Sequence, residues 1–187
     1  MAILSAGKTE GGGVGRMLRT ALIVCFALSP AALFAQRSEY EVKAAFLLNF
    51  ARFVEWPSGR QFTDGKIQLA VVGNSSVAKA IGNAVNGSKV GKFEFQVTYV
   101  AWSADLAAYP MVFVPATESA KYAQLSTLAQ KPVLVVGESP GFANKYGMFN
   151  FFVAEGRVRF EINNAVAKRS NLVVSSQLLQ IAKVIQP

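Results

Sequence analysis

The segment KIQLAVVGNSSVAKAIGNAV, residues 66–85, contains a strand, a glycine turn and a helix in direct succession. Lys66–Val72 is apolar at most positions, as a strand buried on both faces is, and Gly73 ends it. Asn74–Ser76 are residue types that begin helices, and the helix is predicted to run through Val85. A buried strand that leads directly into a helix is typical of a parallel sheet covered on both faces.

The sequence that follows repeats this alternation. Lys92–Val100 (KFEFQVTYV) alternates apolar and polar side chains, as a half-exposed strand does. Met111–Val114 and Pro132–Val136 are short apolar strands, and Ser119–Ala129 between them is predicted to be a helix. We therefore predict an α/β domain with a largely parallel sheet that is flanked by helices on both faces.

The C-terminal third predicts a hairpin instead. Met148–Ala154 and Arg157–Ile162 are strands joined by Glu155–Gly156, and a two-residue turn with glycine is typical of a tight antiparallel hairpin. A short helix, Asn163–Lys168, follows, and Ser175 or Ser176 is expected to cap a final helix. The side chains expected on one face of that final helix are Leu178, Leu179, Ala182 and Ile185.

Glu39–Val54 (EYEVKAAFLLNFARFV) predicts a long first helix, which Ser38 caps and Trp56–Pro57 ends. Its circumference is apolar except for a narrow polar stripe, and such a helix is buried on more than one side. We expect one side to face the sheet and the other to face a second subunit. The side chains predicted in that dimer interface are Tyr40, Phe46, Leu47 and Phe50.

Residues 1–35 have the pattern of a signal peptide. Two arginines precede the apolar run Thr20–Leu28 and small residues follow it, so cleavage is expected near Ala35, with Met17 as an alternative start. A membrane anchor is the other interpretation. A helix that spans a membrane needs about 20 apolar residues, and Ser29–Pro30 ends this apolar run before it reaches that length. We therefore expect export out of the cytoplasm.

Residues 36–187 are predicted to form one domain of scattered basic charge. They carry 16 Lys and Arg against 10 Asp and Glu, a net charge of +6. Proteins that bind nucleic acid cluster their basic residues on one face, so no nucleic-acid partner is expected. The anionic partners that suit an exported basic domain are a membrane surface, a cell-wall polymer or an acidic protein face.

The chain lacks the usual metal ligands. It has no histidine, and its one cysteine, Cys25, lies in the predicted signal peptide. The exported domain therefore has neither a disulfide nor a thiolate site, and no acidic loop suits calcium. We expect no metal and no cofactor. A carboxylate pair for glycoside hydrolysis stays open, although no pair stands out.

Two short motifs match catalytic patterns. Gly137–Gly141 is a G-x-S-x-G sequence around Ser139 that follows a strand, as a nucleophile elbow does. However, no histidine base exists, and Pro140 has no N–H for an oxyanion. Ser76–Lys79 matches S-x-x-K without the S-D-N and K-T-G partners of penicillin-recognising enzymes. We predict a strand-exit turn and a helix start, and no catalytic residue.

Two features favour binding. One is the end of the first helix, because Arg and Trp anchor many recognition surfaces, although Trp56 suits a core position equally well. The other is a polar face of the hairpin, which can hold a carboxylate, although a solvated sheet face is the simpler interpretation. The predicted partner- or ligand-contact residues are Arg52, Trp56, Asn150, Arg157, Arg159 and Glu161.

Several segments resemble one known family. Ala44–Pro57 (AAFLLNFARFVEWP) resembles the opening of the YfiR family of small periplasmic proteins. Gly147–Asn163 (GMFNFFVAEGRVRFEIN) and Leu172–Val184 (LVVSSQLLQIAKV) resemble its closing motif, G-M-x-N-F…G-x-V-R-F-E-I-N…S-S-x-L-L-x-L-A. The resemblance covers essentially all of residues 38–186.

The resemblance implies a periplasmic α/β regulator that forms a homodimer. The family's namesake represses a membrane diguanylate cyclase by binding its periplasmic sensor domain. Cyclic-di-GMP output, biofilm and exopolysaccharide production rise when that repression is lifted. Well-studied members form disulfides, whereas this exported domain has no cysteine, so we do not expect redox control here.

A second hypothesis is a periplasmic protein that binds a small molecule or a cell-wall fragment and has no cyclase partner. Parallel sheets offer a crevice at the carboxyl ends of their strands, which lies here near Gly73, Pro115 and Gly137. An enzyme is the third hypothesis, and the missing catalytic partners disfavour it.

Overall fold

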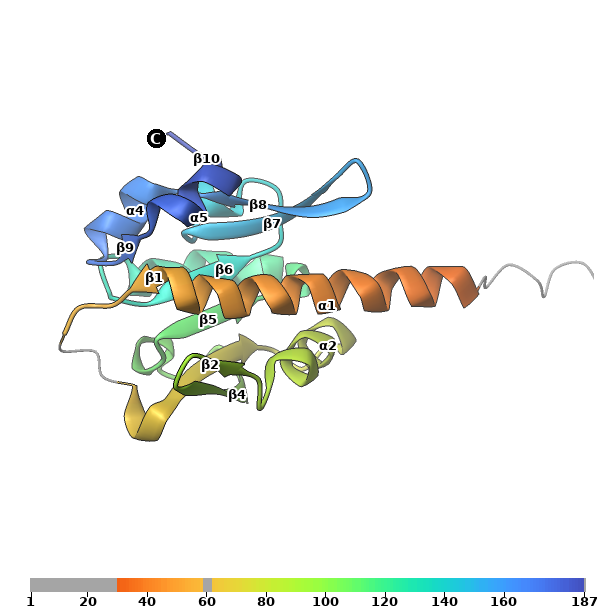
Figure 1. Ribbon diagram of the computed structural model, residues 1–187, viewed down its shortest axis with the longest axis horizontal. Helices are drawn as coiled ribbons and strands as arrows, with labels where there is room; N and C mark the ends of the chain where they lie inside the picture. The colour runs from red at the N-terminus through yellow and green to blue at the C-terminus, as the bar shows by residue number, and fades with distance from the viewer. Residues whose placement is uncertain (1–29, 59–61, 187) are drawn as a thin grey trace, which may run out of the picture. The chain divides into compact units, whose positions relative to one another are not determined.

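The computed structural model describes residues 30–58 and 62–186 (Figure 1). The residues from Gln36 onward form a compact unit, and the description below concerns that unit. Most of the predicted signal peptide, residues 1–29, lies outside the described residues, so export stays a prediction. Within the described ranges, no helix has both the length and the apolar character needed to cross a membrane.

An eight-stranded sheet forms the centre of the domain. All neighbouring strands pair in parallel except two pairs, β7 with β8 and β3 with β4. The predicted α/β fold with a C-terminal antiparallel hairpin is therefore confirmed. In sheet order the strands are β10 (Lys183–Val184), β8 (Arg157–Ile162), β7 (Phe149–Ala154), β6 (Leu134–Gly137), β5 (Met111–Val114), β2 (Lys66–Val72), β4 (Phe93–Val100) and β3 (Lys89–Val90).

Alternate side chains of the buried strands enter two separate cores. Leu69 and Val71 of β2 face one core, whereas Ala70 and Val72 face the other. The first face of the sheet is covered by α1 (Pro30–Phe53), α2 (Ser76–Val85), α4 (Asn164–Arg169) and α5 (Ser176–Ile181). The second face is covered by η2 (Leu106–Ala108), η3 (Ala116–Leu128) and α3 (Phe142–Lys145). Helices on both faces are thus confirmed.

The first helix begins earlier than its sequence pattern predicts. It starts at Pro30, so Ser38 lies inside α1 and is not its cap. Proline is tolerated in the first turn of a helix, and the alanines and leucine that follow favour the helical state. At the other end, β1 (Val54–Glu55) pairs antiparallel with β9 (Val173–Val174), so C-terminal residues hold the end of α1.

The apolar circumference of α1 is covered by the chain's own hairpin. The Phe46 ring lies 5.0 Å from the Phe160 ring, and the Phe50 ring lies 4.9 Å from the Phe149 ring. Leu47 and Phe50 are 0 % exposed, so these two are core residues, and their prediction as interface residues is wrong. Tyr40 and Phe46 are half-buried, and their place in a dimer interface stays a prediction.

Two other elements differ from their predictions. The segment predicted as a helix at Ser119–Ala129 is the 3-10 helix η3. The last helix ends at Ile181, so Ala182 and Ile185 do not share its face as expected. Instead, β10 lies in parallel beside β8, and the Ile185 N–H donates to the Ile162 carbonyl at 2.8 Å. The backbone of residues 183–185 therefore pairs with the edge of β8, whereas in a longer helix it would have formed hydrogen bonds within the helix.

Candidate functional site

The crevice predicted at the carboxyl ends of the strands coincides with a topological switch. Because β2, β5 and β6 are parallel neighbours, the segments after Gly73, Pro115 and Gly137 lie along one edge of the sheet. The chain leaves β2 toward α2 on the first face, whereas it leaves β5 toward η3 on the second face. Open α/β sheets commonly bind ligands where connections diverge in this way. We call this region the carboxyl edge.

The carboxyl edge is filled by its own side chains. Thr117 Oγ1 lies 3.2 Å from Ser75 Oγ, and Trp102 Nε1 donates to Glu118 Oε2 at 2.7 Å. A Cβ atom at Gly73 would collide with the Glu118 carboxylate, and the φ of +82° at Gly73 also favours glycine. The predicted crevice near Gly73 and Pro115 is therefore occupied by residues of this chain.

A buried ion pair ties α1 to the carboxyl edge. Lys43 Nζ lies 2.7 Å from Glu138 Oε2, and each side chain is 6 % exposed. The other Glu138 oxygen accepts the Ala116 N–H at 3.1 Å, and Glu39 is a second carboxylate partner of Lys43. Burial alone would lower the Lys43 pKa, but the charge and hydrogen bond of Glu138, and then those of Glu39, outweigh burial and raise it. The lysine is therefore held protonated and is no general base.

Ser139, the serine of the G-x-S-x-G motif, has a structural contact. The Tyr122 hydroxyl donates to the Pro115 carbonyl at 3.0 Å and lies 2.8 Å from Ser139 Oγ. A phenol has one proton to donate, so Ser139 donates its own proton to the Tyr122 oxygen. Burial is the main cause that raises the Tyr122 pKa, and the Ser139 hydrogen bond opposes it. The serine thus faces a neutral phenol instead of a base.

The S-x-x-K motif is a helix start. Ser75 caps α2, because its Oγ accepts the Ala78 N–H at 3.2 Å. Ser76 and Lys79 are both exposed in the first turn of α2. Both short motifs therefore have the structural roles that the sequence predicts for them, a turn after a strand and the start of a helix.

The predicted contact residues at the end of α1 lie at the amino ends of the strands. Trp56 is half-buried, and its Nε1 donates to the Pro110 carbonyl just before β5 at 3.1 Å. The Trp56 ring also meets the Phe62 ring edge-on at 5.3 Å. Arg52 is exposed, with its guanidinium 5.5 Å from the Phe53 ring. Trp56 therefore fixes the chain after α1 to the sheet.

Asn150 and Glu161 do not lie on a solvated face. They are cross-strand partners in β7 and β8, are 1 % and 8 % exposed, and share a hydrogen bond of 3.0 Å. Lys183 lies 3.5 Å from Glu161. The expectation that these side chains share an exposed polar face with Arg157 and Arg159 is therefore wrong, because the inner end of the hairpin is buried.

The outer end of the hairpin is exposed. Glu155 and Gly156 have φ values of 53° and 69°, as a type I′ turn requires. Strand β10 pairs with β8 only at Glu161 and Ile162, so residues 157–160 have no strand partner on that side among the described residues. Neither Arg157 nor Arg159 forms an ion pair within the described ranges.

A groove of about 240 Å³ runs along this open edge. We call it the β8 edge groove. Four of its residues are consecutive in β8. Sequence analysis names Phe46 of α1 for a dimer interface and misses Ile181 of α5, because nothing local in the sequence places these two beside β8. The residues that line it are Phe46, Arg157, Val158, Arg159, Phe160 and Ile181.

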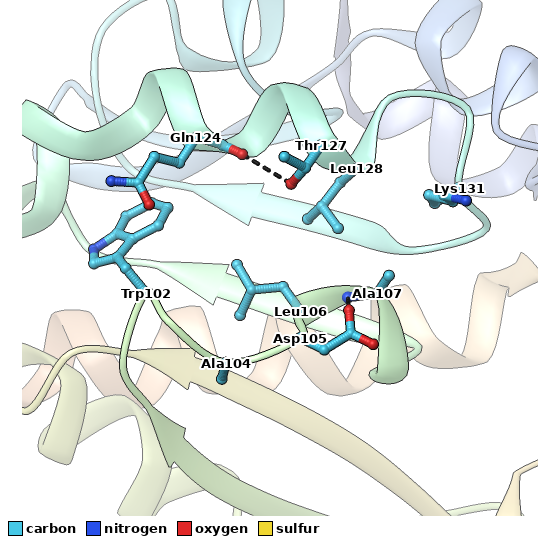
Figure 2. A pocket seen from close by; sticks show the side chains of 9 residues that line it. All are labelled: Trp102, Ala104, Asp105, Leu106, Ala107, Gln124, Thr127, Leu128 and Lys131. Carbon is cyan, nitrogen blue, oxygen red and sulfur yellow. Dashed lines mark hydrogen bonds between the residues drawn. The ribbon is translucent and has the colours of Figure 1, made fainter.

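A larger hollow of about 550 Å³ lies between η2 and η3 on the second face (Figure 2). Leu106 and Leu128 form its apolar middle, with Trp102 at one end and Lys131 at the other. Asp105 at its rim caps η2 by accepting the Ala107 N–H at 3.0 Å. Sequence analysis missed this hollow, because it forms between two short helices whose packing has no periodic pattern.

The part of the chain that the structure describes contains no group of three or more His, Cys, Asp or Glu side chains that could hold a metal ion. Comparison with known protein families shows that a family model described as YfiR/HmsC-like matches residues 40–183. No curated protein matches the chain.

Proposed function

Because the chain belongs to the YfiR/HmsC-like family, we propose that it is a periplasmic, non-enzymatic regulator that represses a membrane-bound signalling enzyme of the diguanylate cyclase type. The protein binds the periplasmic sensor domain of that enzyme and prefers the inactive state of the sensor. Binding then shifts the sensor population toward that state. The observation that supports this proposal is the β8 edge groove, which is open, basic and apolar at once.

The backbone at the groove suits the addition of a partner strand. Ala154 and Arg157 close the two-residue turn and hydrogen-bond to each other, so the backbone groups of Val158 and Phe160 point away from β7. The Ile162 carbonyl, two residues farther along, accepts from Ile185 on that same outer side. An extended segment of a partner can therefore continue the sheet where β10 ends.

The charges at the groove select the partner. Arg157 and Arg159 are exposed and lack ion-pair partners in the described ranges, so acidic side chains on the added segment would form charge-assisted hydrogen bonds. In a two-fold pairing of two β8 edges, residues of the same face lie opposite each other, so arginine would oppose arginine. The groove therefore favours an acidic partner segment over a second copy of this chain.

Apolar contacts supplement the charges. Ile181 at the end of α5 is 67 % exposed, and Phe46 of α1 lines the groove from another element. An acidic segment with alternate apolar residues matches both features, because successive side chains of a strand point to opposite faces.

A crosslinking pull-down from cell-envelope extract tests the proposal. The bait is the wild-type protein, the double variant R157E/R159E, or the matched control K89E/K92E at the opposite edge of the sheet. We expect the wild type and the control to recover a membrane protein with a periplasmic sensor domain and a cytoplasmic cyclase domain, and R157E/R159E to recover at least tenfold less. Absence of such a protein from the wild-type sample would contradict the proposal, as would equal recovery by R157E/R159E.

A second candidate function is the binding of a small molecule or cell-wall fragment without a cyclase partner. The hollow of about 550 Å³ between η2 and η3 favours it (Figure 2), because its size lies in the range of ligand pockets. A thermal-shift screen with metabolites and cell-wall fragments separates the two functions. A shift that Leu106→Ala removes, together with failure to bind any sensor domain, would favour this second function.

A further inference from the structure

We propose that a separate pocket beside the end of α4 binds a small amphipathic anion, meaning a carboxylate or phosphate group on a short apolar chain. This site does not depend on the function proposed above. The pocket has a volume of about 280 Å³ and lies between the end of η3, the segment from α3 to β7 and the end of α4. We call it the α4 pocket.

The charge at the α4 pocket is of one sign. Lys145 at the end of α3 and Arg169 at the end of α4 line it, and both side chains are exposed. Neither forms an ion pair within the described residues, and no acidic side chain lines the pocket. Two unpaired cations from separate elements that converge on one pocket favour an anionic group, which can accept hydrogen bonds from both.

A buried hydroxyl in the same pocket lacks a partner. Ser170 lines the α4 pocket and is 1 % exposed, yet its Oγ forms no hydrogen bond to any described residue. Its backbone N–H is satisfied, because it donates to the Val166 carbonyl at 3.1 Å. Most buried polar groups in folded proteins are paired, so an unpaired one needs an explanation. A bound oxyanion supplies the acceptor that the Ser170 hydroxyl lacks.

The floor of the pocket is apolar, which sets the rest of the ligand. Its side chains come from η3, β6, the residue just before β7 and α4, and they can surround a short hydrocarbon chain. They are Leu125, Leu128, Val135, Met148 and Val166. The volume lies just below the usual range of ligand pockets, so the ligand is small.

The probes for this site separate the head group from the tail. Sodium hexanoate and monobutyl phosphate carry both parts, acetate and inorganic phosphate carry only the anion, and 1-hexanol carries only the chain. We expect saturable binding of hexanoate or butyl phosphate to the purified protein in calorimetric titration, at least tenfold tighter than binding of any single-part probe. Stronger binding of one of the two identifies the head group. Binding should also weaken as salt is raised, because the two cations are exposed.

Variants locate the binding. K145Q and R169Q should each weaken binding of the tighter probe about tenfold. K168Q, the matched control, changes an exposed lysine of α4 that does not line the pocket, and it should change binding less than twofold. Absence of saturable binding for both two-part probes would overturn the proposal, as would affinities that K145Q and R169Q leave unchanged.

S170A gives a test that a merely structural role would not pass. Removal of an unpaired buried hydroxyl should leave the melting temperature of the free protein unchanged or raise it, because no native hydrogen bond is lost. The same variant should weaken binding of the tighter probe about threefold or more. A lowered melting temperature with unchanged binding would show that the hydroxyl supports the fold alone, and it would overturn the assigned role.

Discussion

The carboxyl edge and the outer end of the β7–β8 hairpin use their charged side chains in opposite ways. At the carboxyl edge, Lys43 is buried against Glu138 and Glu118 accepts from Trp102. At the outer end of the hairpin, Arg157 and Arg159 are exposed and form no ion pair with described residues. The first region satisfies its charges internally, whereas the second leaves them available.

This difference shows which region to examine for function. The carboxyl edge contains both short motifs that resemble catalytic patterns, but Ser139 contacts the Tyr122 hydroxyl and the S-x-x-K residues begin α2. The hairpin contains no catalytic motif, yet it has exposed apolar side chains, and among the described residues its cations form no ion pair and residues 157–160 have no strand partner on their outer side. Groups without internal partners are the ones that another molecule can satisfy.

The largest expected effect on stability comes from a substitution at Phe50, which packs α1 against the hairpin. Phe50 is 0 % exposed and its ring contacts Phe149, Phe151 and Phe160 of the hairpin. Phe50→Ala leaves a cavity between α1 and the hairpin and should lower the free energy of unfolding by about 4 kcal/mol, measured by urea denaturation. Phe152→Ala, on the opposite face of β7, is the matched control and should cost about 1 kcal/mol. Equal costs would mean that α1 does not hold the hairpin.

The next largest effect is expected when the buried ion pair between Lys43 and Glu138 is removed. Lys43→Met leaves the Glu138 carboxylate buried without its cation, so we expect a loss of about 3 kcal/mol in the free energy of unfolding. Lys79→Met, at an exposed position of α2, should change it by less than about 0.5 kcal/mol. The double variant K43M/E138Q should lose less than the sum of the two single variants, because they share one interaction. Additive losses would show that the two side chains do not stabilise each other.

Alkaline pH should weaken the carboxyl edge before it affects the hairpin. Glu138 and Glu39 raise the Lys43 pKa above 10.5. The stabilisation of the folded protein by protonated Lys43 is therefore fully present below pH 10.5, and it is lost as pH rises through the pKa that Lys43 has in the folded protein. Burial raises the Tyr122 pKa above 10.0, and ionisation of the unfolded phenol then favours unfolding in the same direction. The free energy of unfolding should therefore fall above about pH 10.

Variants can identify the groups that cause this fall in the free energy of unfolding at alkaline pH. Across pH 9 to 11.5, urea denaturation of K43M and of Y122F should each show a shallower decline than the wild type, whereas R157Q should not. A wild-type decline that both K43M and Y122F leave unchanged would remove these two groups as its cause.

Local patterns in the sequence predict the paired region well and the open region only in part. The bounds of β2, β5 and β8 follow from apolar periodicity, and Ser75 caps α2 as a polar residue before an apolar run should. Lys43 and Glu138 are 95 residues apart in the chain, so no local pattern can pair them.

The candidate site shows the same limit. Alternation along β8 correctly exposes Arg157 and Arg159, but it predicts the same exposure for Glu161, which is buried and contacts Asn150 and Lys183. The groove itself needs Phe46 from α1 and Ile181 from α5, and only tertiary packing brings these elements to one strand edge.

The smallest expected effect on stability comes from substitution of Arg157 and Arg159, and it tests most directly the difference between the carboxyl edge and the outer end of the hairpin. Because Arg157 and Arg159 are exposed and unpaired in the described ranges, R157T/R159T should change the free energy of unfolding by less than about 0.5 kcal/mol. Glu161→Gln, in the same strand, should cost about 1 kcal/mol or more, because it alters a buried hydrogen-bonded pair.

The same double variant should change association. Threonine favours strands and carries no charge, so R157T/R159T removes the repulsion that opposes pairing of two β8 edges. Sedimentation velocity should then show more self-association for R157T/R159T than for the wild type at equal concentration, and R157K/R159K, which keeps both charges, should match the wild type. Identical sedimentation of all three proteins would show that the arginines do not guard this edge, and the contrast between a paired and an open region would then rest on the apolar groove alone.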